Sequence, residues 1–389
     1  MLKDQLEIYI HIPFCVQKCN YCDFLSMPAD DSVKEEYVKA LLEQISLESD
    51  RMKCDMYAAR KISSVYFGGG TPSILSVEML SKIMGAIKKG FPLSADCEIT
   101  IEVNPGTVDK EKIVALRKMG FNRLSIGMQS ANDNELELLG RIHSFEEFKE
   151  CFINSRLAGF DNINVDVMTG LPSQTIEKLD ATLDKVIGLY PEHISTYSLI
   201  IEENTPFYEK YGSIEGPVVG EEVERTMYWN TANKLKINGY KHYEISNFSK
   251  KGYESRHNCG YWKRIPYLGL GLGASSHVCY STGEEYRLKN MSDMKAYIYN
   301  PDAKEENSKL QYKDMVEEFM FLGLRMLDGI SRDEFYQNFG STVEGFYAPV
   351  LDNLNGDGLI MLYEDRIKLS ERGVDYGNYV FSKFLIEKE

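Results

Sequence analysis

No apolar stretch in this sequence approaches the roughly 18 residues that a membrane-spanning helix needs. The first segment, MLKDQLEIYIHIPF, contains charged residues and lacks the apolar core of a secretory signal. Runs of Lys or Arg are also missing, and the net charge is −15 from 44 basic and 59 acidic residues. A field of that sign repels nucleic acid and anionic lipid. We therefore expect a cytoplasmic protein with no integral membrane segment and no nucleic-acid partner.

The eight cysteines do not suggest a disulfide scaffold, because the chain is long and shows no signal sequence. Most of the scattered ones are expected to be small buried apolar residues. These scattered positions are Cys54, Cys97, Cys151, Cys259 and Cys279. The other three fall within eight residues, at Cys15, Cys19 and Cys22. Such clustering indicates metal chemistry.

Short β-branched and aromatic runs alternate with amphipathic stretches of helical period over the first two hundred residues. The runs are Ile8–Ile12, Val65–Phe67, Glu98–Val103, Arg123–Ile126, Ile163–Val167 and His193–Leu199. Alternation of this kind predicts a parallel sheet with helical crossovers. Six units are too few for a closed eight-stranded barrel. The sequence therefore predicts an α/β fold with a partial (β/α)6 TIM-like barrel, and a flat doubly wound sheet is the main alternative.

The rest of the chain divides into two further parts. We predict the barrel over residues 1–240, a connecting region over 241–305 and a last domain over 306–389. In the connecting region, KHYEISNFSK is expected to form a strand and ESRHNCGYWK a loop. The last domain has helices, a small hairpin and a final helix, which resembles a winged-helix unit. Its residues 309–389 hold 9 basic and 15 acidic side chains, a balance that argues against DNA binding.

The three close cysteines have the spacing CxxxCxxC and directly follow the first predicted strand. Thiolates are the usual protein ligands of iron–sulfur clusters, and one loop of this spacing can wrap three corners of a cubane. One iron would then lack a cysteine ligand and stay open to a substrate or cofactor. The alternative is a structural zinc site completed by His11 or a distant cysteine. Zinc motifs, however, usually pair their cysteines two by two.

Polar or glycine residues recur where successive predicted strands end. They are the GGGTP run after the second strand, Glu102 on the third, Gln129 after the fourth and Asp166 on the fifth. In a partial barrel these ends meet at the same side, where binding groups gather. Buried polar groups without partners are costly. A shared ligand is therefore expected at this side of the barrel.

Several motifs resemble the radical S-adenosylmethionine family of oxygen-independent coproporphyrinogen III dehydrogenase. They are YIHIPFCVQKCNYCDF, VYFGGGTPS, IEVNPGTV, RLSIGMQS, LLGRIHS and NVDVMTGLPSQT. The resemblance runs to about Tyr280, and the tail resembles that family's C-terminal domain. It implies a [4Fe–4S] cluster on the three close cysteines, with S-adenosylmethionine bound at the open iron. The residues implied for that cofactor are Tyr9, Gly69, Gly70, Thr71, Glu102, Gln129, Arg141 and Asp166.

Roles for three of these residues follow from the resemblance. Arg141 suits the methionine carboxylate, because a guanidinium can bind it bidentately. Asp166 and Glu102 suit the amino group and the ribose hydroxyls as acceptors. Without the resemblance, Arg141 would be interpreted as a surface arginine on a helix.

Two features depart from the dehydrogenase branch of the family. That branch has a further cysteine two residues beyond the third, and here the position is Phe24. It also has an N-terminal extension, whereas this sequence begins shortly before Tyr9. Both features argue against porphyrinogen decarboxylation.

The string HNCGYW, from His257 to Trp262, resembles the HNxxYW signature of haem chaperones in the same family. The resemblance implies His257 as an axial haem ligand, because neutral imidazole is a standard ligand of haem iron. Tyr261 and Trp262 would supply flat aromatic surface beside the macrocycle. Taken alone, a histidine in a loop is more often a hydrogen-bonded structural residue.

Three hypotheses remain open. The first is a haem chaperone that passes haem to an unidentified acceptor protein and carries the cluster with exchangeable S-adenosylmethionine. The second is a radical enzyme that decarboxylates coproporphyrinogen or opens haem. The third is a zinc-stabilised α/β protein. No catalytic residue is assigned, and a homodimer is one option for the oligomeric state.

Overall fold

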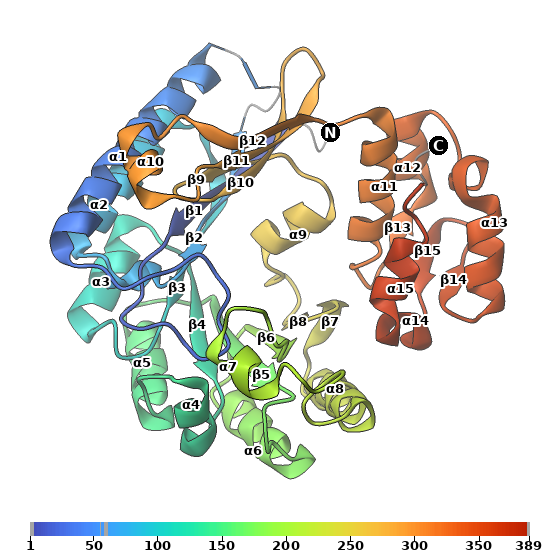
Figure 1. Ribbon diagram of the computed structural model, residues 1–389, viewed down its shortest axis with the longest axis horizontal. Coiled ribbons are helices and arrows are strands. Elements are labelled where there is room, and N and C mark those ends of the chain that lie inside the picture. The colour runs from blue at the N-terminus through green and yellow to red at the C-terminus, as the bar shows by residue number, and fades with distance from the viewer. Residues whose placement is uncertain (1–3, 55, 58–60, 387–389) are drawn as a thin grey trace.

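A strongly curved sheet dominates the computed structural model, which describes residues 4–54, 56–57 and 61–386. Figure 1 shows helices on the outer side of this sheet and a second group of helices beside it. Within the described residues the strands follow the order β12-β11-β10-β9-β1-β2-β3-β4-β5-β6-β8-β7, and β12 does not pair with β7. The sheet is therefore an open barrel.

The central strands of the sheet are parallel and lie side by side in chain order. They are β1 (Gln5–Ile12), β2 (Lys61–Gly69), β3 (Leu93–Val103), β4 (Arg123–Gln129), β5 (Ile163–Thr169) and β6 (His193–Ser198). Each strand overlaps one of the predicted runs. A doubly wound sheet would reverse its strand order at a switch point, and this order does not reverse. The predicted partial (β/α)6 barrel is confirmed.

The outer helices begin and end at the residue types that favour helix termini. They are α1 (Asp31–Lys53), α2 (Val77–Gly90), α3 (Lys110–Met119), α4 (Asp133–Leu139), α5 (Phe145–Leu157) and α6 (Ile176–Ile187). Ser76 and Asp109 accept hydrogen bonds from the first turns of α2 and α3, as expected for N-caps. Gly120 ends α3 with φ +103°, a left-handed conformation that glycine adopts without strain. The short helix α4 was not predicted.

Side chains alternate between two very different faces of the parallel strands. Ile8, Val65, Ile101, Leu124 and Val165 face the outer helices and belong to the main hydrophobic core. The inner face is polar. Strand register places two rows of residues across it, first Tyr9, Tyr66, Thr100 and Arg123, then Glu102, Ser125, Asn164 and His193. Burying so many polar groups inside a barrel costs free energy unless the groups form hydrogen bonds with one another or with a ligand.

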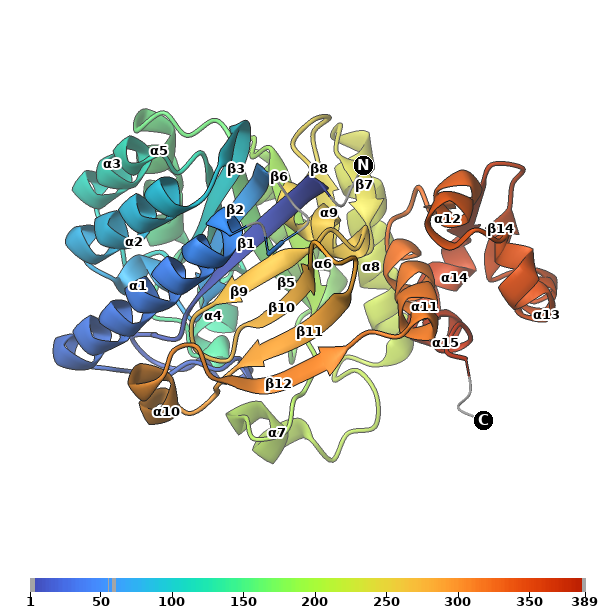
Figure 2. The ribbon, with the colours of Figure 1, turned by 90° about the horizontal axis from the view of Figure 1, so that it is seen from above.

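The sheet continues past β6 and past β1 with later parts of the chain. After β6 come the helices α7 (Pro206–Tyr211) and α8 (Glu221–Ile237). A hairpin of β7 (Lys241–Glu244) and β8 (Asn247–Ser249) then pairs with β6, where one strand was predicted. On the other side, β9 (Tyr267–Leu270) runs parallel to β1 and leads into the antiparallel strands in Figure 2. Those strands are β10 (Ser275–Cys279), β11 (Glu285–Asn290) and, after the helix α10 (Met294–Tyr299), β12 (Lys304–Lys309).

The segment predicted as a loop, ESRHNCGYWK, instead contains the helix α9 (Arg256–Trp262). Ser255 caps it by accepting a hydrogen bond from the backbone N–H of Asn258. The backbone N–H groups of Arg256 and His257 both donate to Oε1 of Glu98 on β3. The prediction failed because these partners come from a distant strand, which local sequence does not reveal. Figure 1 shows α9 on the concave side of the sheet.

The last part of the chain forms its own hydrophobic core, with buried residues from Val316 to Phe384. Its helices are α11 (Tyr312–Gly323), α12 (Arg332–Phe339), α13 (Val343–Gly356), α14 (Glu371–Asp375) and α15 (Gly377–Ser382). An antiparallel sheet of β13 (Ile330–Ser331), β15 (Arg366–Leu369) and β14 (Ile360–Leu362) completes it. Helices with a small antiparallel sheet agree with the predicted winged-helix-like unit.

Two of the predicted domain limits fall inside the large sheet. The strand β12 pairs with β11 as far as Lys309, beyond the limit placed between residues 305 and 306. The region 241–305 was expected to connect two domains, yet β8 pairs with β6 and β9 pairs with β1. Backbone hydrogen bonds therefore make this region part of the barrel sheet. Within the described residues, no helix combines the length and apolar character needed to cross a membrane.

Ion pairs and cation–π contacts join the last domain to the barrel. Glu318 on α11 binds Arg264 at 2.9 Å and Arg287 at 2.9 Å. The guanidinium of Arg325 lies 4.3 Å from the ring centroid of Trp262, the last residue of α9. The last domain therefore contacts the helix that carries the HNxxYW string.

Candidate functional site

The cysteine loop leaves β1 and is held at its start by the strand ends beside it. The backbone N–H of Cys15 donates to the carbonyl of Met27 at 3.1 Å, and that of Thr71 donates to the carbonyl of Phe14 at 2.7 Å. A Cβ on Gly70 would lie 2.7 Å from the Phe14 carbonyl oxygen and 3.0 Å from Cys15 Sγ. Glycine is therefore needed at position 70 for the GGGTP turn to approach the first cysteine.

The far end of the cysteine loop is attached to the end of α4. Asn20 donates from its backbone to Leu139 and from its side chain to Leu138, at 3.0 and 2.9 Å. Gln17 donates to the carbonyl of Gly140 at 2.8 Å. Gly140 has φ +73° and ends the helix. These three contacts hold the far end of the loop against the end of α4 before any metal is added.

All three cysteines of the loop line one cavity of about 530 Å³ at the carboxyl ends of the strands. Thr71 Oγ1 lies 3.5 Å from Cys15 Sγ, and Arg141 Nη1 lies 3.7 Å from Cys19 Sγ. Burial raises the pKa of Cys22, and the neighbouring thiols Cys19 and Cys15 raise it further. A bound cation would offset that repulsion and favour the thiolates.

Histidine does not complete a zinc site beside these thiols. Both ring nitrogens of His11 already have partners: Nε2 lies 2.9 Å from the Leu25 carbonyl and Nδ1 lies 3.0 Å from the Tyr9 hydroxyl. Over the described residues, no three side chains among His, Cys, Asp and Glu are placed to hold a single metal ion.

The same cavity collects the predicted residues from the other strand ends. Gly69, Gly70, Thr71, Glu102, Gln129, Arg141 and Asp166 all line it. The expectation that these groups meet at one side of the barrel is confirmed. Their individual roles toward a cofactor stay predictions.

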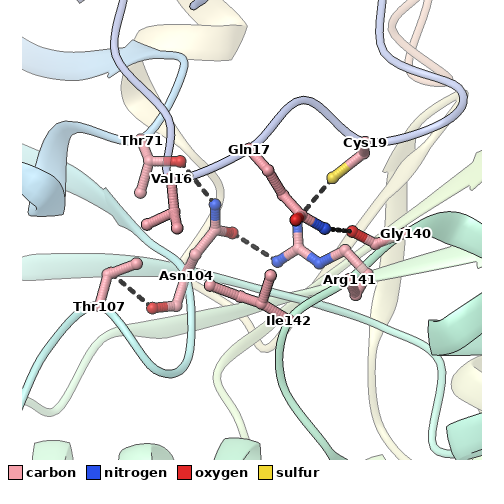
Figure 3. Close-up of a pocket in the computed structure, with 9 residues that line it drawn as sticks. All are labelled: Val16, Gln17, Cys19, Thr71, Asn104, Thr107, Gly140, Arg141 and Ile142. Atoms are coloured by element: carbon pink, nitrogen blue, oxygen red, sulfur yellow. Dashed lines mark hydrogen bonds between the residues drawn. The ribbon is translucent and has the colours of Figure 1, made fainter. Parts of the chain in front are cut away.

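Arg141 lies at the centre of a small polar network, which Figure 3 shows in close-up. Its Nη2 donates to Asn104 Oδ1 at 2.6 Å and to the Gly127 carbonyl at 2.7 Å. Asn104 Nδ2 in turn donates to Thr71 Oγ1 at 2.8 Å. The arginine follows the end of α4 and points into the site, so the interpretation as a surface arginine on a helix is wrong.

Two half-buried carboxyl groups line the same cavity as this arginine. Burial, together with the charge of Asp166, raises the pKa of Glu102 to about 8. Tyr66 donates to Glu102 Oε1 at 2.9 Å. Burial also raises the pKa of Asp166, which accepts from Asn164 Nδ2 at 2.7 Å. A guanidinium and two carboxyl groups in one cavity match a ligand that carries both a carboxylate and cationic or hydroxyl groups.

Gln129 has a strained backbone at the end of β4. Its φ is +73°, in the left-handed region that non-glycine residues rarely adopt. Strain of this kind gathers at ligand sites, where the surrounding structure maintains it. A Cβ on the neighbouring Gly127 would lie 2.7 Å from Asn104 Oδ1. The chain therefore bends sharply where it borders the cavity.

Two of the predicted site residues do not line the cavity. Tyr9 is not among the lining residues but stacks on one of them, with its ring centroid 6.3 Å from that of Tyr66. His257 is only 1% exposed, near the amino ends of the strands. Its Nδ1 lies 2.8 Å from Ser64 Oγ and its Nε2 lies 2.9 Å from the Tyr261 hydroxyl. Burial lowers the pKa of His257 to about 3, so the ring is neutral but has no free nitrogen.

Several residues that border the cavity were not predicted, and three of them lie at or near strand ends. Tyr66 precedes the glycine run on β2, Asn104 follows β3, and Tyr197 lies near the end of β6. Each lies at or near the end of a strand, where binding groups of a partial barrel are expected to gather. The strings VYFGGG and IEVNP place Tyr66 and Asn104 next to predicted residues, so the same rule could have located them.

The barrel with its three-cysteine loop is that of a radical S-adenosylmethionine protein. The family model described as the Radical SAM superfamily matches residues 9–186. The HemN C-terminal domain matches residues 310–376. The protein named "Heme chaperone HemW" in Bacillus subtilis (strain 168) is 36% identical over 97% of this chain and 99% of its own length. The protein of that name in Escherichia coli (strain K12) is 34% identical over 98% of both chains. The chain belongs to the HemW family.

A solved structure shares the whole architecture. The coproporphyrinogen III oxidase HemN from Escherichia coli, described as a radical SAM enzyme, aligns with a TM-score of 0.84. The alignment covers 99% of this chain and 91% of the other, at 23% sequence identity. At that identity the likeness establishes the fold, including the last domain, and leaves the activity to other arguments.

Proposed function

We propose that this protein binds haem and passes it to an acceptor protein, with a [4Fe–4S] cluster and exchangeable S-adenosylmethionine in the barrel. The observation that carries the proposal is full-length similarity to proteins named heme chaperones, at 33 to 36% identity. The HNxxYW string from His257 to Trp262 supports it. We propose that the protein works in the reducing cytoplasm, where the thiols of Cys15, Cys19 and Cys22 would stay available as ligands.

The residues around the cavity fit both groups of the proposed cofactor site. Cys15, Cys19 and Cys22 would hold three irons of the cluster. The cofactor would complete the fourth iron through its amino and carboxylate groups. Arg141 would bind the carboxylate, and the acidic residues Glu102 and Asp166 would accept from amino and hydroxyl groups. Gly69, Gly70, Thr71 and Gln129 would border it, with Tyr9 supporting the site from below.

Replacing Glu102 with glutamine should stabilise the empty protein but weaken the binding of S-adenosylmethionine. The pKa of Glu102 is about 8 in the folded protein, above the value of an exposed glutamate. The fold therefore binds this proton more tightly than the unfolded chain does, and stability is lost as pH rises toward 8. Glu102→Gln removes this loss of stability and should raise the free energy of unfolding at high pH by about 1–3 kcal/mol.

Denaturant unfolding of the cluster-free protein at pH 5 and pH 8.5 measures this effect. The difference between wild type and Glu102→Gln should be largest at pH 8.5 and shrink at pH 5. An equal difference at both pH values would mean that Glu102 is not a buried acid in solution.

Haem binding through His257 requires α9 to leave its packed position. Both ring nitrogens of His257 are engaged, and the ring stacks on Tyr66 at a centroid distance of 5.0 Å. An iron ligand needs a free nitrogen on an accessible face of the ring. We therefore propose that haem is bound by a second arrangement, in which α9 is displaced and His257 is exposed.

Replacing His257 with alanine should weaken haem binding about tenfold or more, since an axial ligand is lost. Titration followed by visible absorbance measures it. His277→Ala is the matched control, because His277 is 2% exposed and hydrogen-bonded to Glu285 but lies outside the HNxxYW string. Equal haem affinity in wild type, His257→Ala and His277→Ala would exclude His257 as the ligand.

The second candidate is a radical enzyme that acts on a porphyrin. The cavity favours this function, because the three thiols line it together with the residues predicted for S-adenosylmethionine, except Tyr9. Anaerobic incubation with reductant, S-adenosylmethionine and a tetrapyrrole distinguishes the two functions. Formation of 5′-deoxyadenosine together with an altered tetrapyrrole would favour the enzyme. An unaltered tetrapyrrole that moves to an acceptor protein would favour the chaperone.

A further inference from the structure

A line of buried hydrogen bonds begins at Asp166, on the wall of the cavity. Asn164 Nδ2 lies 2.7 Å from Asp166 Oδ1 and 2.7 Å from Ser125 Oγ. The amide nitrogen of Asn164 donates to both of these oxygens. The amide oxygen of Asn164 then faces the opposite way, away from the cavity.

His193 on β6 receives that oxygen. Its Nδ1 lies 2.6 Å from Asn164 Oδ1, and its Nε2 lies 2.8 Å from the hydroxyl of Tyr243 on β7. Because Asn164 Oδ1 is an acceptor, Nδ1 carries the proton and Nε2 accepts from Tyr243. Burial lowers the pKa of His193 well below its usual value, which keeps the ring neutral. One tautomer alone satisfies both partners.

The line ends at the start of α9. The Tyr243 oxygen accepts from the backbone N–H of Ser255 at 3.2 Å, and Ser255 is the N-cap of that helix. All four hydrogen bonds run in the same direction, from the helix start to the cavity. Ser255 donates to Tyr243 and Tyr243 donates to His193. His193 then donates to Asn164, and Asn164 donates to Asp166. We call these five residues the Asp166 chain.

The members of the Asp166 chain that link its two ends are almost fully buried. Tyr243 is 1% exposed, His193 is 0% and Asn164 is 2%. Breaking one link inside the barrel leaves buried polar groups unpaired, which costs much more than a surface hydrogen bond. The position of α9 and the orientation of Asp166 therefore depend on each other.

We propose that the Asp166 chain couples the cofactor site to α9, with His193 as the positioning residue that orients Asp166. The inference rests on the proposed S-adenosylmethionine site and gives that site a regulatory role. A cofactor bound to Asp166 strengthens the chain and stabilises the packed position of α9. By reciprocity, displacement of α9 weakens cofactor binding by the same factor. Cofactor occupancy thus controls the exposure of His257.

The test compares two tyrosines three residues apart, in the full chain with its cluster reconstituted without air. Tyr243→Phe removes the hydroxyl that joins His193 to Ser255. Tyr240→Phe is the matched control: Tyr240 is 3% exposed and donates to the Pro191 carbonyl at 2.7 Å, outside the chain. Equilibrium dialysis with labelled S-adenosylmethionine should give about tenfold weaker binding for Tyr243→Phe and no change for Tyr240→Phe.

Hydrogen exchange supplies the second measurement. In wild type and in Tyr240→Phe, added S-adenosylmethionine should slow amide exchange in the peptide 255–262. In Tyr243→Phe the same addition should leave exchange in that peptide unchanged. A folding defect alone would not remove the response to the cofactor.

Two variants at His193 complete the test. His193→Gln keeps one donor and one acceptor, and should retain more cofactor affinity than His193→Leu, which keeps neither. Equal effects of Tyr243→Phe and Tyr240→Phe, or of the two His193 variants, would overturn the coupling alone. If wild type with an intact cluster binds no S-adenosylmethionine, the proposed cofactor site fails and the coupling fails with it.

Discussion

Replacing Cys19 with alanine should remove iron and sulfide together, from about four of each per chain to nearly none. Cys19 is the middle ligand of the loop, and its sulfur also faces Arg141 Nη1 at 3.7 Å. Two remaining thiolates from one loop cannot hold three corners of a cubane. The measurement is iron and sulfide content after anaerobic reconstitution, with electron paramagnetic resonance of the reduced sample.

Cys151→Ala is the matched control for this prediction. Cys151 is also a free cysteine, is 5% exposed and lies on α5 in the main core. Its removal should leave iron and sulfide unchanged. A wild-type sample with one zinc per chain and no sulfide would instead favour the zinc hypothesis, and full iron content in Cys19→Ala would remove Cys19 from the ligand set.

The barrel could be predicted because its signals are local. Each strand and helix of β1 to β6 has its own apolar pattern, and the caps Ser76, Asp109 and Gly120 mark helix ends within a few residues. The helix α9 has no such pattern. It is seven residues long, contains a glycine and depends on Glu7, Ser64 and Glu98 from other strands. Tertiary contacts decide its structure, and sequence reasoning alone did not find them.

The location of the cofactor site could be predicted from the strand ends, but the depth of each side chain inside the barrel could not. Glu102 lies near the carboxyl end of β3 and Asp166 in the middle of β5, and both line the cavity. Tyr9 shares the inner face and stacks on Tyr66, but it does not line the cavity. His257 lies nearer the amino ends of the strands, beside Ser64. Alternation along a strand predicts which face a residue occupies, while height along the barrel depends on the stagger between strands.

The packed position of α9 is supported from two sides. Inside the barrel, its first residues bind Glu98, and His257 contacts Ser64. Outside, Trp262 lies under Arg325 of the last domain. A helix held by both parts can respond to either. A partner bound to the last domain would therefore affect the same helix that we propose the cofactor reaches through Asp166.

Replacing Gly260 with valine should displace α9, lower stability by about 1–3 kcal/mol and yet accelerate haem binding. A Cβ at Gly260 would overlap both carboxylate oxygens of Glu7, whose side chain is 1% exposed. Because Glu7 is buried, its carboxyl group can move aside only by displacing its packed neighbours. The helix must move instead, and its movement frees His257. Stopped-flow absorbance with haem, beside denaturant unfolding, measures both effects.

Gly85→Val provides the comparison, because Gly85 is also a helical glycine and a Cβ there meets nothing within 4 Å. It should change neither stability nor haem binding appreciably. Slower haem binding in Gly260→Val would mean that haem needs α9 in its packed position, and His257 would then act as a structural residue of the barrel. Faster binding that is lost again in the double variant Gly260→Val, His257→Ala would show that the exposed imidazole is the ligand. The direction in which the rate of haem binding changes in Gly260→Val thus shows whether His257 acts as a haem ligand or as a structural residue.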